Sequence, residues 1–356
     1  MALVLAAPLW GLSITTRDWP AVTKDWAVRT LLVVSAALMV TTSWAVSVIL
    51  LLQLIHWRSS RDTTGVVLNL QGPITWGCIA GVLALGSSVP VTWHAWVTQA
   101  FVWSALGQVL WMMGSAIVYR KMPLLDLRLN MRGTTGNAVI TAALLAMAIP
   151  FASPWQQIII GAGLLATGSF VGILAACAAL TIASPAIGWW LVGMAGVAAG
   201  AIRMRTGYRD FFIACRRIVC EHTWNTPFDD SVRERRLVLG LLIRTWLSWP
   251  TWYGLVGKGH QAFSTEARWW LTQRKVFQLF KQAHNDWLQL LLEYGLVGFL
   301  AVTIWMAMLL YSQGTLGDPL TAAVAAGIIA SMGQFPLHLP QSGIPWIILV
   351  GLLVAR

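Results

Sequence analysis

Long apolar runs divide the chain, and shorter polar segments separate them. The runs cover residues 1–16, 30–57, 72–89, 93–118, 134–150, 154–168, 169–184, 185–201, 286–311, 319–336 and 342–355. These runs lack the alternation of apolar and polar residues that is typical of a half-buried strand. They therefore predict helices that are apolar on every side. Several are shorter than the roughly 20 residues that a membrane-spanning helix needs. Run 30–57 has the opposite problem: it fits one long tilted helix, or two helices that turn near Thr41–Ser43.

Composition supports a membrane protein. Of 356 residues, 57% are hydrophobic and 10% are charged, and the mean hydropathy is +0.69, whereas ordinary soluble domains are about 25% charged. We predict an all-α, polytopic membrane protein of about 11–12 transmembrane helices, the count depending on the turn near Thr41. The predicted parts are an N-terminal transmembrane bundle (1–201), a large extramembrane loop with amphipathic helices (202–285) and three final spans (286–356).

Positive charge is concentrated in the predicted loop. The formal net charge is +11, and residues 202–285 hold 14 of the 24 Lys and Arg residues. These cations border apolar runs, which favours anionic membrane lipids or a phosphorylated substrate as partners and disfavours nucleic acid. The loop's last piece, 266–283, has the pattern of a basic amphipathic helix. It is expected to lie in the bilayer interface or to pack on the transmembrane bundle.

The stretch AHNDWLQLLLEYGLVG (283–298) turns a polar segment into an apolar one. In a helix, Asn285, Gln289 and Glu293 share one stripe, and His284 precedes them. One interpretation is structural: Asn285 caps the helix while Gln289 and Glu293 bond to neighbouring spans. A histidine and a carboxylate so close to the edge of the hydrocarbon favour a functional interpretation, because ionisable groups are costly there.

A glycine-rich segment precedes this stretch. Gly257, Gly259 and Phe263 form G-x-G-x-x-x-F. Such glycines let backbone N–H groups approach a phosphate oxygen, and Lys258 adds charge. A plain tight turn is the alternative. Two more punctuated segments are Arg-Gly-Thr-Thr-Gly-Asn (132–137), suited to a turn and a helix cap, and Gly-Gln-Phe-Pro-Leu-His-Leu-Pro (333–340), whose prolines break a helix.

Together these segments resemble the signature of the O-antigen ligase and O-antigen polymerase superfamily. The matching features are HN-x-x-LQ-x-x-x-E-x-G-x-x-G, the G-x-G-x-x-x-F stretch, the glycine-rich entry ending in Asn137 and Phe-Pro-x-x-x-Pro. They fall within roughly residues 132–351. One departure is Phe170, which follows Ser169 where the family often has Arg. Members are membrane glycosyltransferases that use undecaprenyl-pyrophosphate-linked glycans as donors.

The resemblance implies transfer of a glycan to a sugar hydroxyl with inversion, without a metal or other cofactor. It makes His284 the general base, supported by Asn285, Gln289, Glu293, Gly257 and Gly259. Arginine grips phosphate oxygens with a planar fork. The family's donor-binding arginine corresponds to Arg235 or Arg236, with Arg244 as a third candidate. A second arginine corresponds to Arg203 or Arg205, and Lys258 adds charge.

The resemblance also implies the partners and the location. The donor is a lipid-linked glycan, and the acceptor is a glycan or the lipid A core of lipopolysaccharide. We expect the bacterial inner (plasma) membrane, with the active-site loop facing the periplasm or the cell exterior. The positive-inside rule favours a cytoplasmic loop, but that rule weakens for long loops. The rival functions are a secondary transporter of a small anion, a protein O-oligosaccharyltransferase of the same family, and a non-enzymatic glycan-binding protein.

Overall fold

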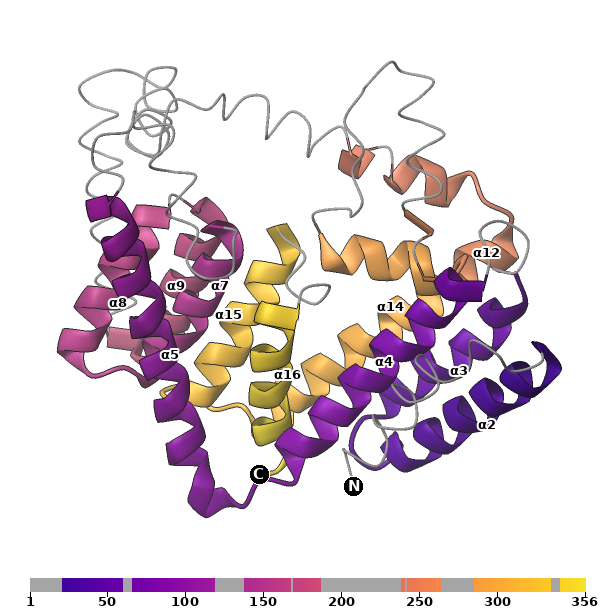
Figure 1. Ribbon diagram of the computed structural model, residues 1–356, viewed down its shortest axis with the longest axis horizontal. Coiled ribbons are helices and arrows are strands. Elements are labelled where there is room, and N and C mark those ends of the chain that lie inside the picture. The colour runs from indigo at the N-terminus through magenta and orange to yellow at the C-terminus, as the bar shows by residue number, and fades with distance from the viewer. Residues whose placement is uncertain are drawn as a thin grey trace. The chain divides into compact units, whose positions relative to one another are not determined.

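The computed structural model describes only part of the chain (Figure 1). The described residues are 21–59, 66–118, 138–167, 169–186, 238–240, 242–260, 262–263, 285–333 and 340–356. Their helices are α2 (Ala21–Met39), α3 (Trp44–Ser59), α4 (Val66–Ser87), α5 (Val91–Val118), α7 (Ala138–Ala148), η3 (Ile149–Phe151), α8 (Pro154–Thr167), α9 (Phe170–Ala183), α12 (Thr251–Val256), α14 (Asp286–Gln313), α15 (Pro319–Gly333) and α16 (Pro340–Val354). Within these ranges every element is helical, which confirms the all-α prediction.

The long run 30–57 divides into two helices. Helix α2 ends at Met39 and α3 begins at Trp44, so the chain turns where the second alternative placed the turn. Serine side chains satisfy backbone groups on both sides of it: the Val46 N–H donates to Ser43 Oγ (3.3 Å), and Ser47 Oγ donates to the Ala36 carbonyl (2.8 Å). A polar turn therefore persists inside an apolar run because its own serines satisfy the backbone.

Few of the described helices are long enough to cross a bilayer. Among them, helix α14 alone is long and apolar enough to be a membrane-spanning helix. The helices Thr75–Ser87 and Val91–Ser115 meet the same test only when they are counted together as one span that is bent at a break. The other apolar helices are 10–17 residues long. The runs at 1–16 and 187–201 lie outside the described residues. The count of eleven or twelve spans therefore stays a prediction.

The chain forms two compact units, and the sequence alternates between them. The first comprises the described parts of residues 1–89, 235–313 and 350–356. In it, α2 packs on α3 and α4, and α14 packs on α3 and α12 (Figure 1). Its apolar core joins α3, α12 and α14 through Ile49, Leu52, Val256, Leu290 and Tyr294.

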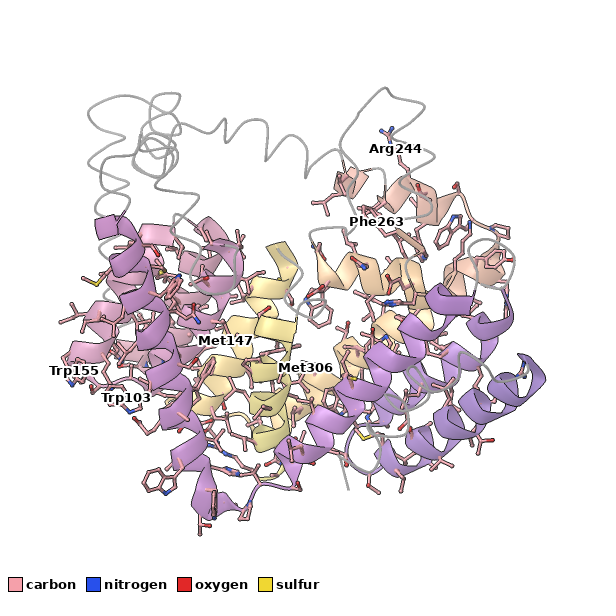
Figure 2. All side chains as sticks on the ribbon, in the orientation of Figure 1. Trp103, Met147, Trp155, Arg244, Phe263 and Met306 are labelled. Atoms are coloured by element: carbon pink, nitrogen blue, oxygen red, sulfur yellow. The ribbon has the colours of Figure 1, made fainter. Side chains whose placement is uncertain are left out.

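The second unit comprises the described parts of residues 90–234 and 314–349. Helix α9 packs on α7 and α15, and α8 packs on α5 and α7. Gly172 lies against Ala142, so small residues let these helices approach closely. On the surface, the rings of Trp103 and Trp155 lie 6.4 Å apart between centroids (Figure 2). The predicted domain boundaries after residues 201 and 285 stay a prediction.

One close contact in the second unit can be tested directly. Trp346 is buried over Gly327, and its Nε1–H donates to the Val324 carbonyl (3.1 Å). A Cβ at position 327 would overlap the indole ring. We expect Gly327→Ala to lower the free energy of unfolding by about 1–3 kcal/mol, as overpacking does. Thermal unfolding of the purified protein in detergent measures the change.

Gly161→Ala is the matched control. Gly161 lies inside α8 with nothing within 4 Å of its added Cβ. Alanine has the higher helix propensity, so this variant should be neutral or slightly more stable. Equal effects of the two substitutions would contradict the close packing of Trp346 on Gly327.

Candidate functional site

The site is organised around a break in α14. At Gly295 the backbone takes φ 64° and ψ −168°, which is not helical. A break leaves carbonyls of the preceding turn without their regular partners four residues on. Here the Leu292 carbonyl accepts the Lys258 N–H (3.1 Å), and the Glu293 carbonyl accepts the Gly259 N–H (2.8 Å). Residues 257–260, which we call the glycine loop, therefore lie directly on the broken helix.

Glycine is required where these two backbones meet. Gly257 has φ 80° and Gly259 has φ 93°, and this left-handed region suits residues without a Cβ. A Cβ at Gly257 would overlap the Glu293 carbonyl, and one at Gly295 would overlap the Leu255 carbonyl. A Cβ at Gly259 would lie 3.0 Å from the Cβ of His56. The glycines therefore permit backbone contact between the loop and the helix.

The hydrogen bonds of the loop differ from the sequence expectation. We expected its N–H groups to approach a phosphate oxygen, but those of Lys258 and Gly259 donate to α14, and that of Gly257 donates to the Tyr253 carbonyl (2.8 Å). The physical reason is the break, which supplies two carbonyls that need donors. The tight-turn alternative describes this backbone better.

The side chains of Lys258 and Phe263 make different contacts at the two ends of the glycine-rich stretch. The Lys258 ammonium lies 4.4 Å from the centroid of the Trp249 ring and 5.6 Å from that of Tyr253, in cation–π geometry. Phe263 is buried and packs with Val238, Leu242 and Leu292 (Figure 2). The phenyl ring thus anchors the end of the G-x-G-x-x-x-F stretch on α14, while a role of Lys258 in pyrophosphate binding stays a prediction.

Glu293 is the buried charge of the site. Its side chain is 2% exposed, its Oε1 accepts Gln289 Nε2 (2.9 Å), and its Oε2 lies 3.2 Å from Nδ1 of His260. Gln289 and Glu293 are one helical turn apart on the predicted stripe and bond to each other, a contact that the structural interpretation did not name. Asn285 instead caps α14, because its Oδ1 accepts the Leu288 N–H (2.9 Å). The structure thus joins the two motifs through a His–Glu pair.

A second set of polar contacts surrounds Tyr294, the residue after Glu293. Its hydroxyl accepts Gln53 Nε2 from α3 (2.5 Å) and Trp76 Nε1 from α4 (2.6 Å). The ring of His56, also on α3, lies 6.1 Å from that of Tyr294 between centroids. We call Gln53, His56, Trp76, His260, Gln289, Glu293 and Tyr294 the polar cluster. It lies entirely within the first unit.

Sequence reasoning singled out only Gln289 and Glu293 of this cluster as site residues. A signal for two others was present: Gln53 and His56 are polar, three residues apart and therefore on one helix face, inside an apolar run. Polar groups on one face of an apolar helix usually meet partners from another helix. Nothing comparable marks Trp76, because tryptophan is frequent throughout this chain.

Several predicted residues lie outside the described parts of the chain. They are His284, Arg203, Arg205, Arg235 and Arg236, together with the motifs at 132–137 and 334–339. Arg244 is described: it is exposed, and its guanidinium extends outward from its helix (Figure 2). Among the residues with described positions, no three His, Cys, Asp or Glu side chains are grouped as metal ligands would be. Metal independence therefore stays a prediction.

The contact between loop and helix predicts a large effect at Gly257. We expect Gly257→Ala to lower the free energy of unfolding by roughly 1–3 kcal/mol or more, from backbone strain and the overlap with Glu293. Gly254→Ala, on α12 three residues before the loop begins at Gly257, should have little effect, because nothing lies within 4 Å of its added Cβ. Thermal unfolding in detergent compares the two. Similar melting temperatures would contradict the contact.

Comparison with known proteins identifies no family. No protein-family model matches the chain, and no curated protein sequence matches it significantly. The resemblance to the O-antigen ligase and polymerase superfamily therefore depends on the motif residues themselves. The structure adds that two of those motifs, at 257–263 and 285–298, lie against each other.

Proposed function

We propose that the chain is a polytopic membrane glycosyltransferase of the O-antigen ligase or polymerase type. It transfers a glycan from undecaprenyl pyrophosphate to a sugar hydroxyl. The observation that carries the proposal is the contact between the glycine loop and the HN-x-x-LQ-x-x-x-E-x-G segment. Two motifs that suggested the family separately form one site, with an imidazole, a carboxylate and an amide in contact.

The surface of the described helices supports a place in the membrane. Helix α5 alone exposes Trp93, Trp96, Trp103, Leu110 and Trp111. Soluble monomers seldom expose large contiguous apolar areas, whereas lipid-facing helices do. Helices of 10–17 apolar residues are short for single spans, and they suit a bundle in which spans are broken. We propose the bacterial inner membrane, with the site facing the periplasm or the cell exterior.

The proposed reaction is a direct displacement. The acceptor oxygen forms a bond to the anomeric carbon as the bond from that carbon to the pyrophosphate oxygen breaks, and the electron pair leaves with the pyrophosphate. Arginines neutralise the departing diphosphate, and the candidates are Arg203, Arg205, Arg235, Arg236 and Arg244. A histidine takes the hydroxyl proton, and the resemblance gives this role to His284.

A secondary transporter of a small anion is the second candidate function. The specific observation in its favour is the break of α14 beside the buried Glu293, because transporters build their sites at discontinuous helices with ionisable groups. Radiolabelled solute uptake into proteoliposomes, measured beside glycan transfer, separates the two functions. A protein O-oligosaccharyltransferase differs from the first proposal only in its acceptor.

The function is tested by incubating the purified protein with an undecaprenyl-pyrophosphate-linked oligosaccharide. Three acceptors are offered in parallel: a second lipid-linked glycan, a lipid A core and a serine-containing protein. Mass spectrometry should show a product whose mass equals acceptor plus glycan in one of the three reactions. Intact donor in all three, in protein that is folded and monodisperse, would contradict glycosyl transfer.

Donor binding predicts a selective effect of the arginines. We expect Arg235→Ala and Arg236→Ala together to raise the KM for the lipid-linked donor about tenfold to a hundredfold, since charge-assisted hydrogen bonds contribute about 1.5–3 kcal/mol each. The KM for the acceptor should change much less. Replacing both residues by lysine keeps the positive charges but removes the planar guanidinium groups. The donor KM of this variant should therefore lie between that of the wild-type protein and that of the alanine variant. Equal changes in both KM values would argue against pyrophosphate binding.

A further inference from the structure

The segment that leads into the glycine loop carries large apolar side chains on its outside. On its inner side, Leu242 of the helical residues 242–247 belongs to the same core cluster as Leu292 of α14. Trp246 Nε1–H donates to the Gly254 carbonyl (3.1 Å), which joins these residues to α12. Five side chains of the segment are 39–67% exposed, and we call them the outer face: Ile243, Leu247, Trp252, Tyr253 and Leu255.

The charge pattern of α14 indicates which part of this helix faces hydrocarbon. Before the break the helix carries Asp286 and Glu293, whereas residues 296–311 include no charged side chain. From Gly295 to Gln313 the helix is about 28 Å long at about 1.5 Å per residue, close to the roughly 30 Å of a hydrocarbon core. In the proposed membrane location, the break therefore lies near one edge of the hydrocarbon.

Helix α12 lies beside this break. A Cβ at Gly295 would overlap the Leu255 carbonyl, and the loop that follows α12 bonds to carbonyls just before the break. The outer face is therefore at the level of the lipid headgroups. Its Trp252 and Tyr253 are residue types that concentrate at that level, because each ring is apolar with one polar tip. Tyr311, which is 92% exposed near the other end of α14, fits the opposite headgroup region.

The charges beside the outer face favour an anionic surface. The sequence from residue 235 to residue 265 contains no Asp or Glu. Arg244 lies between two side chains of the outer face in the sequence, and its exposed guanidinium extends outward (Figure 2). The Lys258 ammonium lies over the Tyr253 ring, 5.6 Å from its centroid. Glu293 is buried, so its carboxylate does not reach this surface. Cations that border an apolar face are attracted to anionic lipids.

We propose that the outer face is a membrane-docking surface, which inserts into the headgroup region of a leaflet that contains anionic phospholipid. The aliphatic side chains enter the upper acyl boundary, Trp252 and Tyr253 lie among the headgroups, and Arg244 contacts lipid phosphate. The diphosphate of a lipid-linked donor lies at the same level, so docking holds the glycine loop at the depth of that group. The inference rests on the proposed membrane location and does not require glycosyl transfer.

The test measures the depth of single residues in the full-length protein, reconstituted in nanodiscs of phosphatidylglycerol and phosphatidylcholine. The four native cysteines are replaced by serine, and one bimane-labelled cysteine is introduced as Leu247→Cys or Trp252→Cys. Ile304→Cys, at a 47% exposed position of α14, is the hydrocarbon reference. Lipids with a nitroxide on the headgroup should quench the first two labels about twofold more than lipids with a nitroxide deep in the acyl chain. Ile304→Cys should show the opposite order.

The preference for anionic lipid is measured with the label at Trp252→Cys. Headgroup-labelled phosphatidylglycerol should quench it about two- to fivefold more than headgroup-labelled phosphatidylcholine at equal mole fraction, as a cation near an anionic surface predicts. Arg244→Gln should lower this ratio toward one. Arg244→Lys is the matched control, because it keeps the charge and should keep the ratio. Equal quenching by the two lipids without a change at Arg244 would contradict docking on anionic lipid.

Three other outcomes overturn the inference. Quenching of Leu247→Cys and Trp252→Cys by aqueous iodide, with none by either lipid, would place the outer face in water. Quenching of both from deep in the acyl chain, as at Ile304→Cys, would make the segment part of a span. No lipid quenching at Ile304→Cys would remove the proposed membrane location and the docking surface with it. Absence of glycan transfer would remove the enzymatic function alone, because the docking measurement does not depend on it.

Discussion

The described site depends on the backbone hydrogen bonds that close the break in α14. Leu292 and Glu293 are buried, and a buried carbonyl without a hydrogen-bond donor costs free energy because it has lost its contact with water. The Leu292 and Glu293 carbonyls avoid that cost by accepting the N–H groups of Lys258 and Gly259. Contact this close between two backbones requires glycine at 257 and 295. The loop therefore supplies the donors that the broken helix needs, and the broken helix supplies the acceptors for the N–H groups of the loop.

This mutual support has a chemical consequence. Helix and loop together bring Glu293, otherwise an isolated carboxylate in an apolar helix, within 3.2 Å of His260 and within 2.9 Å of Gln289. A buried charge is stable only when such partners compensate for its lost hydration. On the next residue, Tyr294 ties the same turn to α3 and α4 through Gln53 and Trp76. Three other segments of the first unit, α3, α4 and the glycine loop, thus converge on one turn of α14.

The sequence predicted the helices better than it predicted the site. Apolar runs gave the all-helical fold and the positions of α8, α9, α14 and α15 closely, because burial along a whole run leaves a clear signal. They did not decide whether 30–57 turned, since serines at 43 and 47 satisfy that turn without a glycine or proline to mark it. Helical spacing placed Gln289 and Glu293 on one stripe, but the structural interpretation paired them with neighbouring spans and did not name the bond between them. The partnership of His260 with Glu293 did not, because it depends on a contact between residues 33 positions apart (293 − 260).

The most direct measurement of the loop–helix contact is amide hydrogen exchange at Lys258 and Gly259. Bonded to carbonyls inside the bundle, these two N–H groups should exchange slowly, close to the rate of the amides within α14. The comparison is made in detergent micelles at neutral pH, by mass spectrometry of overlapping peptides or by NMR. Exchange at the rate of an unstructured peptide would show that the glycine loop is not held on the broken helix, and would contradict the account of the site.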